Sequence, residues 1–170
     1  FLATKISFIN EIADLCERVG ADVQDIARGI GMDNRIGPKF LMAGPGYGGS
    51  CFPKDTLALL KTGRDFEAPL RIVEAVVLSN DDRKRAMGRK VVKALDGETH
   101  GKSVGVLGLT FKPNTDDMRD SPALAIVQAL QDAGMKVRAY DPEGMEQAAK
   151  LLDGVTYCKD AYEALEGASA

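Results

Sequence analysis

The residues best suited to chemistry lie around Cys51, which directly follows a glycine-rich stretch. Pro53 suits the first turn of a helix, so Cys51 is expected at the start of one. The free N–H groups and the macrodipole at a helix start favour a thiolate. Asp55 lies four residues further on, one helical turn away on the same face. A thiol and a carboxylate at this spacing suit covalent catalysis followed by activation of water.

The glycines at 44–49 have the spacing of a dinucleotide-binding loop, GxGxxG. That loop joins the first strand of a βαβ unit to its helix, and an acidic residue follows about twenty positions later. Here helical patterns lie on both sides and no second strand follows. We therefore interpret the glycines as backbone that approaches a ligand, with Lys54 adding positive charge near the thiol. On spacing alone, Cys51 could equally be a small buried hydrophobic residue.

The composition excludes several classes of protein. The chain has 170 residues, 45% of them hydrophobic, and a net charge of −3, so partners such as nucleic acid or an anionic membrane surface are not expected. No apolar run approaches the roughly 18 residues of a membrane span, and no signal peptide is visible. Three scattered cysteines without CxxC predict neither a disulfide framework nor a metal site, and indicate a reducing, cytoplasmic location. Because Phe1 opens in mid-pattern, we expect a piece of a longer protein.

Periodicity predicts two differently built domains. In the first, residues 1–98, helices are expected at 1–18, at 22–30 with Asp22 as cap, at 53–63 and at 69–95. The basic residues of the last of these helices are expected on a solvated face, namely Arg83, Lys84, Arg85, Arg89 and Lys90.

The second domain, residues 99–170, alternates strands with helices, which predicts βαβ units and a parallel sheet. Strands are expected at 103–109, 137–140 and 155–158, and helices at 123–133, 143–152 and 162–165. Ser121 should cap the first of these helices, and Asp141 the second. Cys16 and Cys158 are expected in the core of their domains.

Two long stretches resemble signatures of the UDP-glucose/GDP-mannose dehydrogenase family. GYGGSCFPKD at 46–55 is similar to its active-site signature, and GLTFKPNTDDMRDS at 108–121 to the loop that opens its nucleotide-sugar domain. Residues 1–11 resemble the long central helix of the family, and residues 31–37 its dimer segment. The resemblance implies an α-helical central dimerisation domain followed by a partial α/β, Rossmann-like nucleotide-sugar-binding domain.

The resemblance also implies an activity, which is NAD-dependent four-electron oxidation of UDP-glucose to UDP-glucuronate by a homodimer. Cys51 would form a thiohemiacetal and then a thioester, and Asp55 would help water to release the product. The catalytic lysine and asparagine of the family lie upstream of Phe1, and its NAD-binding domain is not in view. Lys5 matches a structural basic position rather than that lysine, and Met42 stands where relatives can carry a basic residue.

Other roles are carried over from the resemblance position by position. Arg35 matches an arginine that reaches a nucleotide in the partner subunit, and Arg119 and Lys54 match cofactor-side cations. Fixed cations suit a diphosphate, and open parallel sheets bind ligands where their first strand ends. The remaining implied substrate-binding residues are Phe40, Leu41, Tyr47, Gly48, Phe111 and Lys112.

Three alternatives stay open from the sequence. The first is a sister dehydrogenase acting on GDP-mannose or a UDP-N-acetylhexosamine. The second is a cysteine hydrolase or acyl transferase, which needs a base such as His100, the one histidine. The third is a non-catalytic dimerisation or nucleotide-binding module.

Overall fold

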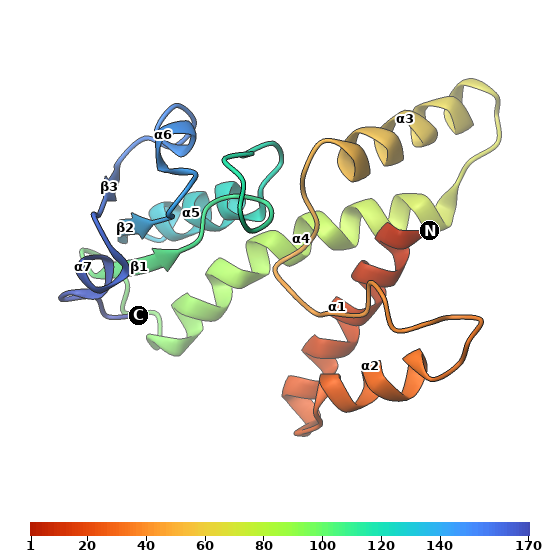
Figure 1. Ribbon diagram of the computed structural model, residues 1–170, viewed down its shortest axis with the longest axis horizontal. Helices are drawn as coiled ribbons and strands as arrows, with labels where there is room; N and C mark the ends of the chain where they lie inside the picture. Colours follow the sequence, from red (N-terminus) through yellow and green to blue (C-terminus); the bar gives the residue numbers. More distant parts are fainter. The chain divides into compact units, whose positions relative to one another are not determined.

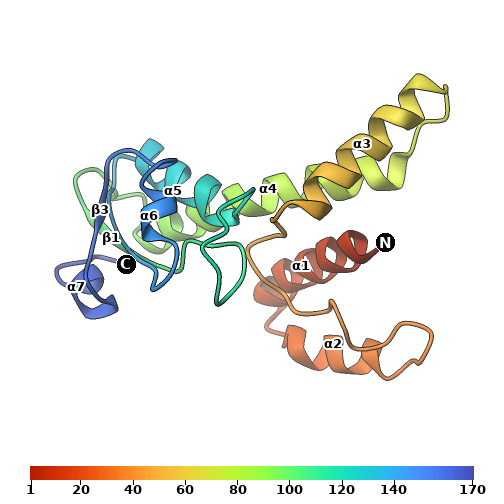
Figure 2. The ribbon, with the colours of Figure 1, turned by 45° about the horizontal axis from the view of Figure 1, so that its top comes forward.

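The computed structural model describes residues 1–170, drawn as ribbons in Figure 1 and Figure 2. The chain divides into two compact units. The helical unit contains residues 1–47 and 54–83, and the sheet unit contains residues 48–53 and 84–170. Helices α3 (Cys51–Asp65) and α4 (Arg71–Ala94) each contribute residues to both units. The division into domains 1–98 and 99–170, which the periodicity of the sequence suggested, stays a prediction.

The helical unit opens with α1 (Leu2–Val19) and α2 (Val23–Gly31), which pack against each other in both ribbon views. Both ends of their connection are fixed locally. Gly20 ends α1 in the left-handed conformation, and the Asp22 carboxylate accepts from the Gln24 amide at 2.8 Å, which confirms the predicted cap. Ile9 of α1 and Ala27 of α2 form a small core together with Leu41.

Several polar side chains are buried in the helical unit, which the periodicity did not predict. Asn10 and Asn80 are almost fully buried, and Arg83 is only 8% exposed. The expectation of a solvated basic face on α4 is therefore wrong for Arg83, and also for Lys84. The reason for Arg83 is tertiary, because its guanidinium donates to the carbonyls of Gly44 and Asn10.

The sheet unit is built on the predicted parallel sheet. Strands β1 (Ser103–Leu107), β2 (Lys136–Tyr140) and β3 (Val155–Tyr157) lie side by side in that order (Figure 1). Three helices complete the unit: α5 (Pro122–Asp132), α6 (Met145–Ala148) and α7 (Ala161–Leu165). Val127, Leu130 and Val137 are among the most deeply buried residues of the core.

Local signals were sound at α5 and misleading at α6. Ser121 accepts from the Ala123 amide at 3.2 Å, so the predicted cap is confirmed. The helix expected at 143–152 is observed only as the short α6, and the Asp141 carboxylate binds the Glu143 and Gly144 amides in the turn that precedes it.

Two general observations complete the fold. Cys16 and Cys158 are both buried, as predicted for core cysteines. None of the helices combines the length and the apolar character needed to cross a bilayer.

Candidate active site

Cys51 is the first residue of α3, as its neighbours predicted, and it is the exposed thiol among the three cysteines. The Ser50 hydroxyl lies 3.7 Å from its sulfur. Asp55 follows one turn further along α3, and its carboxylate lies 3.4 Å from the Lys54 ammonium. Both of these charged groups are mostly exposed to solvent. The helix start therefore presents a thiol, and the same helix carries an ammonium and a carboxylate within its first two turns.

Within the sheet unit, the glycines before Cys51 pack on the second sequence motif. The Gly49 amide donates to the Arg119 carbonyl at 2.8 Å. A Cβ on Gly48 would lie 2.2 Å from the Asp120 carbonyl oxygen, and one on Gly49 would lie 2.7 Å from the Phe111 ring. These approaches are possible only without side chains, which gives the glycines a physical reason. The two motifs, far apart in sequence, thus meet.

Phe111 and Lys112 follow the end of β1, as the resemblance implies. The Lys112 ammonium lies 5.1 Å from the centroid of the Phe111 ring, within the range of a cation–π contact. Thr110 fixes the backbone beside them, since its hydroxyl donates to the Lys112 carbonyl at 3.0 Å. Lys112 is otherwise exposed, so its charge is available to an anion.

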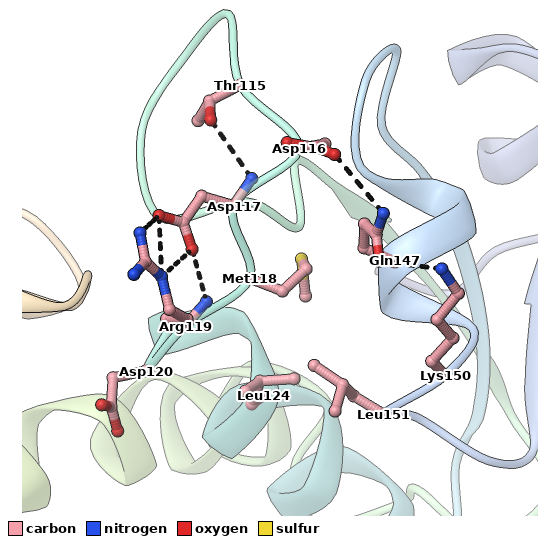
Figure 3. A pocket seen from close by; sticks show the side chains of 10 residues that line it. All are labelled: Thr115, Asp116, Asp117, Met118, Arg119, Asp120, Leu124, Gln147, Lys150 and Leu151. Carbon is pink, nitrogen blue, oxygen red and sulfur yellow. Dashed lines mark hydrogen bonds and ion pairs between the residues drawn. The ribbon is translucent and has the colours of Figure 1, made fainter.

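Arg119 lies at the rim of a cavity of about 740 Å³ (Figure 3). Its guanidinium is held by Asp117, which accepts from Nε at 2.9 Å and from the Arg119 amide at 3.0 Å. The side-chain hydrogen bond from Arg119 is the main cause that lowers the pKa of Asp117 to about 2, and the same bond raises the pKa of Arg119. The other residues that line this cavity are Thr115, Asp116, Met118, Asp120, Leu124, Gln147, Lys150 and Leu151.

Asp141 joins the two loops that follow β1 and β2. One carboxylate oxygen accepts from the Leu109 and Thr110 amides, and the other accepts from Glu143 and Gly144, at 2.7 to 3.2 Å. Burial alone would raise the pKa of Asp141, but these four donors outweigh it and the pKa is lowered. The predicted helix cap at Asp141 is not found, because Gly144 is the N-cap of α6 and the two amides that Asp141 binds lie in the turn before that helix.

The helical unit holds a second cavity of about 620 Å³, lined by Phe40 and Tyr47 among others. Two residues carried over from the resemblance therefore share one cavity. Leu41 does not, because its side chain is buried in the core beside Ile9. The remaining lining residues are Ile6, Pro38, Lys39, Met42, Gly44 and Gly46.

Buried side chains fix the backbone at one wall of this cavity. Asn80 binds both polar groups of Tyr47, accepting from its amide at 2.8 Å and donating to its carbonyl at 3.2 Å. Asn10 accepts from the Gly44 amide at 2.8 Å, and Arg83 donates to the Gly44 carbonyl at 2.8 Å. Sequence reasoning missed Asn10, Asn80 and Arg83 as supports of the site. A polar residue on an otherwise apolar helix face, such as Asn10, was the available signal.

Tyr47 itself is buried, and its desolvation raises the pKa of the phenol, while a hydrogen bond with Thr56 opposes that shift. The ring is therefore held at its backbone and at its hydroxyl.

Arg35 is highly exposed and is bound to Asp33, which accepts from its Nε at 3.0 Å and from its amide at 2.9 Å. The next two carbonyls, of Ile36 and Gly37, accept from the buried Lys5 ammonium at 2.9 and 3.1 Å. The structural role expected for Lys5 agrees with this position.

His100 is poorly placed to serve Cys51 as a base. It precedes β1 and lies against Gly134, at the amino end of the sheet. The loop that contacts the Cys51 segment follows the opposite, carboxyl end of β1. A cysteine hydrolase built on these two residues therefore has no support in the geometry.

Comparison with known proteins agrees with this arrangement from end to end. Residues 1–82 match the central domain of the UDP-glucose/GDP-mannose dehydrogenase family, and residues 105–170 match its UDP binding domain. UDP-glucose 6-dehydrogenase from Rhizobium meliloti is 69% identical over the whole chain, which covers 39% of that protein. UDP-glucose 6-dehydrogenase TuaD from Bacillus subtilis is 50% identical, with all of this chain and 37% of that protein covered.

Solved structures show the same fold. A UDP-glucose dehydrogenase from Pyrobaculum islandicum superimposes with a TM-score of 0.92 at 41% identity, covering 99% of this chain and 39% of that one. An NDP-N-acetyl-D-galactosaminuronic acid dehydrogenase from Methanosarcina mazei gives 0.81 at 26% identity, covering 96% and 36%. The chain spans about two fifths of the length of the curated relatives that it matches. The central domain and then the UDP binding domain of the family match along the chain, so this chain belongs to the UDP-glucose/GDP-mannose dehydrogenase family.

Proposed function

We propose that this chain is the central and UDP-binding part of a UDP-glucose 6-dehydrogenase, with Cys51 as its nucleophile. The observation that carries the proposal is the exposed Cys51 thiol at the start of α3, in a chain 69% identical throughout to such an enzyme. A sister substrate is less well supported, because the N-acetylhexosaminuronate relative is only 26% identical.

The residue type at position 51 follows from the reaction. Oxidising a primary alcohol to a carboxylate removes two hydrides, and the second can leave only from a tetrahedral adduct of the aldehyde. The Cys51 thiolate supplies that adduct by adding to C6 of the sugar, giving a thiohemiacetal. Loss of the second hydride and a proton gives a thioester on Cys51. Water then cleaves the C–S bond and restores the thiol.

The balance for the whole sequence is one alcohol, two NAD⁺ and one water converted to one carboxylate, two NADH and three protons. Asp55, one turn along α3, would orient the water that attacks the thioester. The Lys54 ammonium lies 3.4 Å from the Asp55 carboxylate and would help to place it.

Each unit carries residues that the resemblance implies for nucleotide-sugar binding. In the helical unit, the aromatic side chains of Phe40 and Tyr47 line a cavity of a size that suits part of a nucleotide. In the sheet unit, Lys112 and Phe111 would meet the diphosphate and sugar, with Gly48 leaving room beside them. Arg35 would reach a nucleotide bound in the partner subunit of a homodimer.

Arg119 and Lys54 are each an exposed cation of the kind that suits the diphosphate of NAD. The cofactor would supply the hydride acceptor. Arg119 enters this role already oriented, because Asp117 fixes its Nε edge and leaves the rest of the guanidinium at the cavity rim. The glycines at 44–49 do not form the dinucleotide-binding loop of a βαβ unit, since α2 precedes them and α3 follows them.

The test is to count NADH per sugar for the complete dehydrogenase with a panel of UDP-glucose, UDP-N-acetylhexosamines and GDP-mannose. We expect two NADH per UDP-glucose and little turnover of the others. One NADH per sugar would contradict the covalent route, and preference for another nucleotide sugar would assign a sister substrate.

Cys51→Ser should lower kcat by at least about a hundredfold and release no free UDP-glucuronate. The matched control is Cys158→Ala, a buried cysteine outside the site, which should keep its turnover. An active Cys51→Ala enzyme would remove Cys51 from the mechanism.

A further inference from the structure

Gly48 and Gly49 are two contact points of the segment that carries Cys51 within the sheet unit. Gly49 touches two groups of the loop after β1, which are the Arg119 carbonyl, by a hydrogen bond of 2.8 Å, and the Phe111 ring, by close packing. Gly49 has φ of +79°, a conformation that favours glycine. Because glycine has no side chain, Gly49 makes these contacts through its backbone. The position of the Cys51 segment in this unit therefore depends on how those two groups are held.

Both partners of Gly49 are attached to one residue, Asp117. Its carboxylate accepts from the Arg119 amide at 3.0 Å and from the Arg119 side chain, so it fixes this residue on both sides of its Cα (Figure 3). Its carbonyl accepts from the Phe111 amide at 3.2 Å. The Asp117 amide is in turn held by the Thr115 hydroxyl at 3.2 Å.

The backbone just beyond Arg119 is tightly constrained. Asp120 has φ of +49°, which a non-glycine residue adopts only when its surroundings require it. Its carbonyl oxygen would lie 2.2 Å from a Cβ on Gly48. A shift of this turn by a few tenths of an ångström would therefore be transmitted directly to the residues before Cys51.

We propose that Asp117 is a positioning residue for Cys51, which it places through the Arg119 carbonyl and the Phe111 ring. The proposal rests on the proposed function of Cys51 as nucleophile. It gives the Asp117–Arg119 pair a second task beside the cofactor, which is to hold the loop that delivers the thiol. A misplacement of about 1 Å can cost a reaction about a hundredfold, so such a residue matters without touching substrate.

The direct test is amide hydrogen exchange of the 170-residue chain, followed by NMR. Asp117→Ala should speed exchange of the Gly49 amide at least about tenfold, because its acceptor carbonyl is no longer fixed. Asp117→Asn keeps an oxygen acceptor for the Arg119 amide and should fall between. Asp116→Ala removes the neighbouring carboxylate, which contacts only Gln147 at 3.4 Å, and should leave Gly49 unchanged. Unchanged Gly49 exchange in Asp117→Ala would overturn the proposal.

The second test measures kinetics of the complete dehydrogenase at saturating NAD. Asp117→Ala should lower kcat by about ten- to a hundredfold with a smaller change in KM for UDP-glucose, and Asp117→Asn should restore part of the loss. A defect that saturating NAD abolishes would show that Asp117 serves only cofactor binding through Arg119, and would overturn the proposal. If the unaltered enzyme oxidises no nucleotide sugar, the proposed function fails, while Gly49 exchange still decides the link between Asp117 and the Cys51 segment.

Discussion

The same Asp-x-Arg turn occurs once in each unit of the molecule. Asp33 accepts from the amide and Nε of Arg35 at 2.9 and 3.0 Å, and Asp117 accepts from the same atoms of Arg119 at 3.0 and 2.9 Å. Both carboxylates have a lowered pKa, and the hydrogen bond from the arginine side chain is the main cause in each. The local chemistry of the two turns is therefore alike.

The surroundings of the two turns differ, and the backbone of each turn has a different role. In the helical unit the turn is itself held, since the carbonyls of Ile36 and Gly37 accept from the buried Lys5 ammonium. In the sheet unit the turn does the holding, since the Arg119 carbonyl accepts from Gly49. The motif orients an arginine in both places, and the sheet unit also uses its backbone as a support for another loop.

The largest loss of stability and activity is expected from a substitution of Gly48, which packs against the Asp117–Arg119 turn of the sheet unit. In Gly48→Ala the new Cβ would overlap the Asp120 carbonyl, so backbone must move, at a cost of about 1–3 kcal/mol in the free energy of unfolding. We expect a loss of kcat of about a hundredfold in the complete dehydrogenase. Urea unfolding and steady-state kinetics measure the two effects.

Gly29→Ala is the matched control, because a Cβ there meets no atom within 4 Å. In the interior of α2 this change should raise the free energy of unfolding by about 0.5–1 kcal/mol. Equal and small effects at both glycines would contradict the close approach of the two loops.

The next largest loss of stability is expected from a substitution of Lys5, which binds the backbone beside the Asp33–Arg35 turn. Lys5→Met removes the donor of two carbonyls near the end of that turn, and should lower the free energy of unfolding by about 2 kcal/mol. Lys61→Met is the control, because the Lys61–Asp65 pair is exposed, and its loss should cost less than about 0.5 kcal/mol. Should the two substitutions prove equivalent in urea unfolding, the Arg35 turn would not depend on Lys5.

Sequence reasoning located what depends on neighbours along the chain. The caps at Asp22 and Ser121 and the start of α3 at Cys51 follow from residue types within a few positions. The parallel sheet followed from the alternation of elements. The core position of Cys16 followed from the apolar helix face that it shares, and that of Cys158 from its place at the end of a strand.

What sequence reasoning missed depends on partners far along the chain. Arg83 lies on a basic helix face, and its burial is explained by distant partners, which are the carbonyls of Gly44 and Asn10 and the carboxylate of Asp14. The Asp141 carboxylate accepts from the Leu109 amide, 32 residues earlier, as well as from the Gly144 amide. No pattern within the glycine motif indicates that Gly49 would find Arg119.

An effect that is lost in acid is expected at Asp141, which ties together the loops after β1 and β2 beside the Asp117 turn. Its pKa in the folded chain is below the ordinary 3.8, so its contribution to stability is present above pH 3.8 and is lost as pH falls through the folded value. Asp141→Asn keeps one acceptor and should cost about 1–3 kcal/mol at neutral pH. Urea unfolding from pH 7 to pH 3 should show the two proteins converging below about pH 4. A difference that stays constant over that range would show that the charge of Asp141 is not what the four amides require.

The smallest effect distinguishes the two turns by titration. Asp117 has a cause that Asp33 lacks, the positive charge of Lys112, and its pKa falls to about 2. Carboxyl-carbon chemical shifts measured against pH should therefore place Asp117 below Asp33. Lys112→Gln should raise the pKa of Asp117 and leave the pKa of Asp33 unchanged. Arg35→Gln should raise only the pKa of Asp33. Because the charge of Lys112 is the weakest of the influences on the pKa of Asp117, its removal should raise that pKa less than Arg119→Gln does. If Lys112→Gln moved both carboxylates alike, the charge of Lys112 would not be specific to the sheet-unit turn, and the two turns would differ only in what their backbones contact.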